Sequence, residues 1–75
     1  MAQQREELAI LRLPQLEDQV GLKRSAIYEK MNKKSKHYDS TFPVTVSLGE
    51  RSVGWLAHEV ADWISSLQRK REEEQ

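Results

Sequence analysis

One glycine constrains the fold of this chain more than any other residue, because Gly21 separates two short segments of helical periodicity. In the first segment, Leu16 and Val20 are four residues apart and therefore share one helix face. Pro14 suits the first turn of a helix, where its missing N–H costs no hydrogen bond. Glycine readily adopts the left-handed conformation that ends a helix. The sequence therefore predicts a helix from Pro14 to Val20 that ends at Gly21.

A second helix has to begin almost at once, at Lys23 or Arg24. Ile27 and Met31 then lie together on its inner face, again because four residues make about one helical turn. The outer face carries Ser25, Tyr28, Glu29 and Asn32. Two short helices joined by a glycine-containing turn make a helix-turn-helix.

A β-hairpin is predicted next, from two stretches of strand character at residues 44–48 and 52–55. The tight connection Gly49-Glu50-Arg51 lies between them. A hairpin that follows a helix-turn-helix forms a wing. The predicted fold class is mainly α with a small β-hairpin, a winged helix-turn-helix of three helices and a two-stranded wing.

The third helix carries the clearest amphipathic pattern in the chain. Four apolar residues recur on one face at i, i+3, i+4 and i+7: Val60, Trp63, Ile64 and Leu67. The pattern predicts a helix from about Ala57 to Arg69, with Trp63 in the core and Trp55 packed nearby.

The 75 residues are enough for one small domain. We expect a polar N-terminal arm at residues 1–10, a winged helix-turn-helix domain at 11–69 and a tail at 70–75. The tail has no apolar residue and has opposing charge blocks, so it is expected to be disordered.

An enzyme is not expected, because so short a chain leaves little sequence for an enclosed active site. The chain has no cysteine, and His37 and His58 are separated by two predicted elements, so no metal site and no cofactor are predicted. No apolar run approaches the roughly 20 residues that cross a bilayer, and the N-terminus lacks the hydrophobic region of a secretion signal. The expected location is the cytoplasm.

A formal net charge of zero conceals a strongly basic segment. Between residues 23 and 36, six cations stand against Glu29 alone, a local excess of five positive charges that the rest of the chain balances. The cations are Lys23, Arg24, Lys30, Lys33, Lys34 and Lys36. Segregated positive charge attracts polyanions such as DNA. The alternative is a lysine-rich loop that is simply solvated.

The position of this charge next to the helix-turn-helix favours double-stranded DNA as the partner. The first residues of the second helix enter the major groove in such folds, which assigns base contacts to Lys23, Arg24 and Ser25. Tyr28, one turn on, is placed to reach a phosphate or a thymine methyl group, and Glu29 completes the set on this helix. The predicted phosphate contacts are Lys33, Lys34 and Lys36, with Arg51 at the tip of the wing.

Each of these assignments has a structural alternative. Ser25 alternatively supports the first turn of its helix, and Tyr28 alternatively lays its ring on the core. Glu29 suits a solvated or orienting role better than contact with cytosine. Arg51 is alternatively an exposed turn residue without a specific role.

A series of motifs in fixed order resembles the AlpA family, small DNA-binding regulators encoded by prophages and integrative elements. The motifs are Arg12-Leu13-Pro14, Gly21-Leu22-Lys23-Arg24-Ser25-Ala26-Ile27-Tyr28, Asn32, Lys34-Ser35, Tyr38-Asp39, Thr41-Phe42-Pro43, Leu48-Gly49 and Ser52-Val53-Gly54-Trp55. The similarity covers about Leu11 to Leu67 and is more specific than a generic helix-turn-helix pattern. Members often have Ser or Ala at the position of Lys23 and Pro at that of Lys33, so this chain adds charge at both ends of its second helix.

The resemblance implies a bacterial, nucleoid-associated protein that binds promoter or attachment-site DNA. It implies activation of an integrase gene, or action as an excisionase that bends DNA, with further copies of the chain on adjacent sites and an integrase as possible partners. The alternative is a protein-interaction module that docks on an integrase or RNA polymerase through Tyr28, Tyr38 or the last helix.

Overall fold

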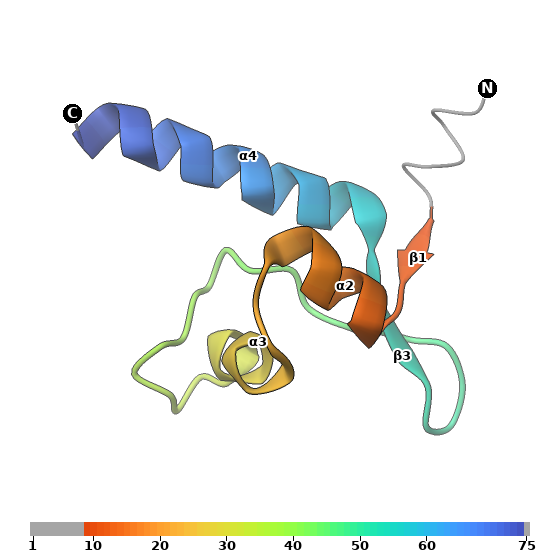
Figure 1. Ribbon diagram of the computed structural model, residues 1–75. Coiled ribbons are helices and arrows are strands. Elements are labelled where there is room, and N and C mark those ends of the chain that lie inside the picture. Colours follow the sequence, from red (N-terminus) through yellow and green to blue (C-terminus); the bar gives the residue numbers. More distant parts are fainter. Residues whose placement is uncertain (1–8, 75) are drawn as a thin grey trace.

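The computed structural model describes residues 9–74 and shows three helices and a small antiparallel sheet (Figure 1). The elements in chain order are β1 (Ile10–Leu11), α2 (Leu13–Val20), α3 (Arg24–Met31), β2 (Val46–Ser47), β3 (Val53–Leu56) and α4 (Ala57–Glu74). This arrangement confirms the predicted winged helix-turn-helix. Residues 1–8, most of the predicted N-terminal arm, lie outside the described residues.

The helix-turn-helix is built as the local sequence predicts. Gly21 ends α2 with a φ of 73°, in the left-handed region, and its N–H donates a 2.9 Å hydrogen bond to the carbonyl oxygen of Glu17. The helix begins at Leu13, one residue before the predicted start at Pro14. α3 begins at Arg24, as predicted, with Ile27 buried on its inner face.

The sheet has three strands, one more than the sequence predicts. β3 is central and pairs antiparallel with β1 (Ile10↔Leu56, Leu11↔Trp55) and with β2 (Val46↔Gly54, Ser47↔Val53). Ile10, assigned by sequence to the polar arm, therefore belongs to the folded domain. A chain segment this short has no periodicity of its own, and it becomes a strand because the edge of β3 supplies hydrogen-bonding partners.

Gly54, on the central strand, is packed closely between the two flanking segments. A Cβ atom at this position would meet the side chain of Ile10 and would lie 3.1 Å from the carbonyl oxygen of Leu11 and 3.3 Å from Cδ1 of Leu48. The close packing of the strands therefore requires glycine here.

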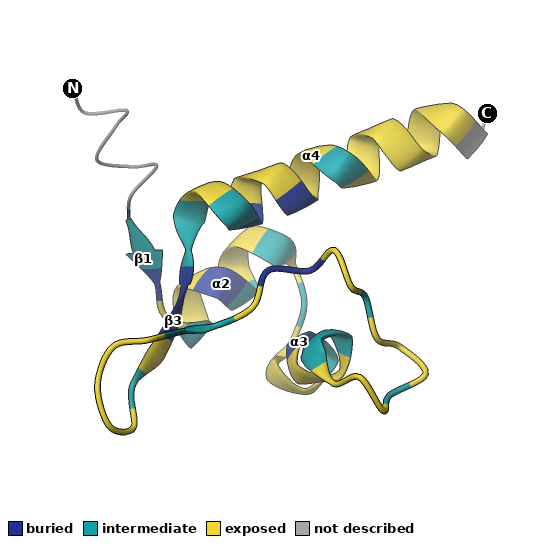
Figure 2. Cartoon of the chain, turned by 180° about the vertical axis from the view of Figure 1, so that it is seen from behind, coloured by how far each residue is buried: buried dark blue, intermediate teal, exposed yellow. Residues whose placement is uncertain are grey.

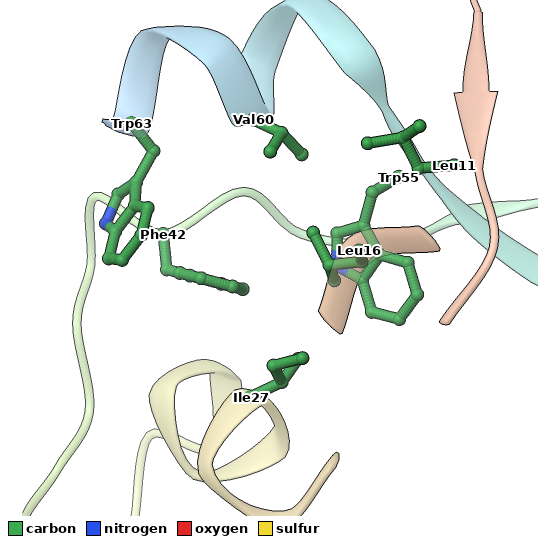
Figure 3. Close-up of a cluster of buried hydrophobic side chains, with 7 residues drawn as sticks. All are labelled: Leu11, Leu16, Ile27, Phe42, Trp55, Val60 and Trp63. Carbon is green, nitrogen blue, oxygen red and sulfur yellow. The ribbon is translucent and has the colours of Figure 1, made fainter. Parts of the chain in front are cut away.

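One hydrophobic core holds the helices and the sheet together (Figure 3). It comprises Leu11, Leu16, Ile27, Phe42, Trp55, Val60 and Trp63. Trp63 packs edge-on against Phe42, with ring centroids 4.9 Å apart. The predicted core position of Trp63 is confirmed. Burial of one such aromatic side chain contributes on the order of 3 kcal/mol to stability.

The last helix differs from its prediction in two respects. Ile64 and Leu67, predicted on the core face, are 37% and 41% exposed, because the C-terminal half of α4 projects beyond the body of the protein (Figure 1). The predicted disordered tail at residues 70–75 is helical through Glu74. Arg, Lys and Glu are good helix formers, and extending an existing helix avoids the cost of nucleation.

Candidate nucleic-acid interface

α3 presents its first residues to solvent. Lys23 is the residue before the helix, Arg24 and Ser25 occupy its first turn, and all three are exposed. No side chain caps this end of the helix within residues 9–74, so the first backbone N–H groups keep their capacity to bind an anion. In the described part of the chain, Ser25 does not cap the first turn with its side chain, which is the form that its alternative role as support for this turn would take.

Tyr28 contacts the core and is also partly exposed. Its ring packs edge-on against Trp55, with centroids 6.5 Å apart and an interplanar angle of 65°, yet the side chain is 39% exposed. The guanidinium carbon of Arg24 lies 5.7 Å from the centroid of the same ring, at cation–π distance. α3 therefore brings Arg24 and Tyr28 together at its exposed side.

The lysine loop, residues 32–38, follows α3 and is held by short-range hydrogen bonds. The Asn32 carboxamide oxygen accepts from the N–H of Lys34 at 3.0 Å. The Ser35 hydroxyl accepts from the N–H of His37 at 3.0 Å and donates to Oε1 of Glu29 at 3.3 Å. Glu29 is thus linked to the loop through Ser35, and its contact with DNA stays a prediction.

The lysine loop exposes all three of its cations, Lys33, Lys34 and Lys36. Most of the segment that follows α3 is coloured as exposed in Figure 2. These side chains form no ion pair within residues 9–74, so the protein leaves their charge available to an external anion. Lys30 differs, because its ammonium lies 5.6 Å from the centroid of the Trp63 ring and is directed toward the body of the protein.

Asp39 anchors the end of this loop to two helices. Its N–H donates to the carbonyl oxygen of Lys30 at 2.9 Å, and its Oδ2 accepts from Nε1 of Trp63 at 3.1 Å. Its Oδ1 accepts from the N–H of Thr41 at 2.9 Å and from the Thr41 hydroxyl at 2.6 Å. In the sequence Asp39 stands only as part of the family motif Tyr38-Asp39, although an aspartate two residues before a threonine is typical of a side-chain-stabilised turn.

The same contacts shift the acidity of Asp39. Burial alone would raise the pKa of its carboxyl group. The hydrogen bonds from Thr41 and Trp63, with the positive charge of Lys70, outweigh this effect and lower the pKa from 3.8 to about 2. The Asp39 carboxyl group is therefore ionised at neutral pH and accepts these hydrogen bonds as a carboxylate.

The wing, residues 46–56, lies with α3 on the side of the molecule away from α4 (Figures 1 and 2). A 2.8 Å hydrogen bond from the N–H of Leu48 to the carbonyl oxygen of Ser52 closes its tip, and Arg51 is exposed there. Arg51 has no hydrogen bond or ion pair within the described part of the chain and belongs to a separate element from the α3 residues.

Residues 9–74 lack two other kinds of feature. This part of the chain holds no group of three His, Cys, Asp or Glu side chains placed to bind a metal ion. It also contains no helix that is both long enough and apolar enough to span a membrane.

Comparison with known proteins places this architecture in a family. A family model described as prophage CP4-57 regulatory protein (AlpA) matches residues 9–69. The chain belongs to the AlpA family. The match runs from β1 into α4 and includes every predicted DNA-contact residue, whereas the last part of α4 lies beyond it.

Two AlpA-family relatives illustrate the range of similarity. The DNA-binding transcriptional activator AlpA of Escherichia coli (strain K12) is 44% identical over 61 residues, 81% of this chain and 87% of that protein. The uncharacterized protein ORF88 of Enterobacteria phage P4 is 42% identical over 55 residues, 73% of this chain and 56% of that protein. The chain thus spans little more than half of the phage protein. No solved structure gave a significant match.

Proposed function

We propose that this AlpA-family protein binds double-stranded DNA sequence-specifically and regulates genes of a prophage or integrative element. One observation carries the proposal: exposed cations at the start of α3 and in the lysine loop form no ion pair within residues 9–74. They lie beside a helix of the type that enters the major groove. The name of the E. coli relative, a DNA-binding transcriptional activator, supports the same function.

The contacts divide by chemistry. Arg24 is suited to bidentate contact with guanine, and Lys23 and Ser25 to further base edges. The lysine loop and Arg51 at the wing tip neutralise phosphates and set the register on the duplex without reading sequence. One α3 helix reads only a short site, so we infer that several copies bind adjacent sites.

Within this function, the regulated step is activation of an integrase gene, excision of the element, or both. A footprint on DNA flanking the protein's own gene and the nearby attachment site distinguishes them. Protection upstream of an integrase promoter indicates activation, and repeated, closely phased protection at the attachment site indicates excision.

Salt titration with matched variants tests the binding mode. Lys33→Ala and Lys34→Ala should weaken binding to all sequences alike, and each should reduce the slope of log affinity against log salt by about 1. Arg24→Ala should instead relax discrimination between the specific site and altered sites. The control is Arg71→Ala, which removes an exposed charge from α4. Undiscriminating binding that does not respond to salt would refute the proposal.

A second candidate is a protein-interaction module. The exposed apolar side chains of Ile64 and Leu67 on α4 favour it, because they lie on the element opposite α3 and the wing. Charge reversal at Lys23 and Arg24 separates the two functions. This candidate would be favoured if the variant still captures an integrase or polymerase and the wild-type chain shifts no DNA.

A further inference from the structure

Three side chains from two elements form a continuous series of contacts, called here the stack, that runs from the exposed side of α3 into the core. Arg24 and Tyr28 are four residues apart on α3 and therefore neighbours on one face. The Arg24 guanidinium lies over the Tyr28 ring at 5.7 Å, and the Tyr28 ring meets the ring of Trp55, on β3, at 6.5 Å. Trp55 is fully buried.

We propose that Tyr28 is a positioning residue for Arg24 and that Trp55 in turn fixes Tyr28. This inference rests on the proposed DNA-binding function and assigns base readout at this point of the site to Arg24 alone. It replaces the sequence-based expectation that Tyr28 itself contacts a phosphate or a thymine methyl group.

The physical reason is the conformational freedom of arginine. A free arginine side chain samples many rotamers, and holding it in one geometry opposes binding. A guanidinium stacked on an aromatic ring has lost part of this freedom before DNA arrives, and its planar donors then point in a defined direction. The rigid end of the stack is Trp55, whose position is set by the core and by the pairing of Leu11 with Trp55.

This arrangement also couples the wing to the recognition helix. Trp55 belongs to the strand that forms one side of the wing, so the orientation of the wing and the direction of Arg24 depend on the same buried ring. The contacts of the wing with the DNA backbone and the base contact of Arg24 are thereby fixed in position relative to each other.

The test compares two substitutions at Tyr28 in the full chain. Tyr28→Phe keeps the ring and removes the hydroxyl, and should retain discrimination between the footprinted site and a duplex with one guanine contact replaced. Tyr28→Leu removes the ring and should lower this discrimination about threefold, as expected for loss of one exposed cation–π contact. Competition binding at fixed salt measures both ratios.

A double-mutant cycle with Arg24→Ala makes the test specific. In the Arg24→Ala background, Tyr28→Leu should change discrimination no further, since there is no arginine left to position. Thermal melting by circular dichroism is recorded for each variant, because a purely structural Tyr28 would lower the melting temperature without this dependence on Arg24.

Three results would overturn the inference. Equal losses for Tyr28→Phe and Tyr28→Leu would indicate direct contact by the hydroxyl. Equal losses for Tyr28→Leu with and without Arg24 would indicate independent roles, as would a Tyr28→Leu variant with unchanged discrimination. In these cases the proposed function still stands if the wild-type chain discriminates between DNA sites. A wild-type chain that does not bind duplex DNA would refute both the inference and the proposed function.

Discussion

The indole N–H of Trp63 donates a 3.1 Å hydrogen bond to Oδ2 of Asp39 and so joins α4 to the segment that ends the lysine loop. The same indole packs on Phe42, and the Lys30 ammonium lies over it. One core side chain thus connects the last helix, the end of α3 and the loop. The position of the exposed lysines therefore depends on a contact inside the body of the protein.

Asp39→Asn is expected to destabilise the fold by about 1 to 2 kcal/mol, since the carboxylate is only partly buried. An asparagine can still accept from Thr41, but its amide nitrogen would then face the donor of Trp63. Urea unfolding measures the loss, with Asp62→Asn on the exposed side of α4 as the matched control. Equal stability of the two variants would contradict the anchoring role.

The stability that Asp39 contributes should disappear in acid. Its pKa is lowered to about 2 in the folded protein from an ordinary value of 3.8, so between these values the unfolded chain takes up a proton that the folded chain does not. The contribution is complete above about pH 4 and is lost as the pH falls toward 2. Unfolding free energies of wild type and Asp39→Asn should therefore converge over this range. A difference that is independent of pH would show that the charge of Asp39 is not responsible.

Ser35→Ala should weaken DNA binding without removing any charge. The substitution deletes the hydroxyl that links Glu29 to the N–H of His37, so the lysine loop loses part of its preferred conformation. We expect affinity to fall severalfold on all sequences, with the slope against salt unchanged, because the lysines still release the same counterions. Anisotropy titrations check this, with Ser65→Ala on α4 as control. A reduced salt slope would point instead to the loss of a phosphate contact.

Gly54→Ala should separate the strands of the sheet. The added methyl group would meet Ile10 and the Leu11 carbonyl, and overpacking of this kind costs about 1 to 3 kcal/mol. The melting temperature should fall accordingly. Gly21→Asn is the matched control, since nothing lies within 4 Å of a Cβ there and asparagine tolerates the left-handed conformation. A greater loss in the control would contradict the role assigned to Gly54.

Local signals in the sequence predicted most of the helix-turn-helix and the wing. Gly21 ends α2, and the spacing of Ile27 and Met31 orients α3, because capping and helical periodicity depend only on neighbours along the chain. The turn at Gly49-Glu50-Arg51 joins β2 to β3 for the same reason. The exposed positions of Lys23, Arg24 and Ser25 followed directly from these elements.

The tertiary structure decided the relationships between residues distant in the chain. Helical spacing put Ile64 and Leu67 on the face of Val60, but only the extent of the body decides that they are exposed. The strand β1 exists through its pairing with β3. The Asp39–Trp63 bond and the stack of Arg24, Tyr28 and Trp55 join elements whose approach depends on how the whole core packs. Sequence periodicity predicts the face of the helix or strand on which a side chain lies. Tertiary packing determines which other residues that side chain contacts.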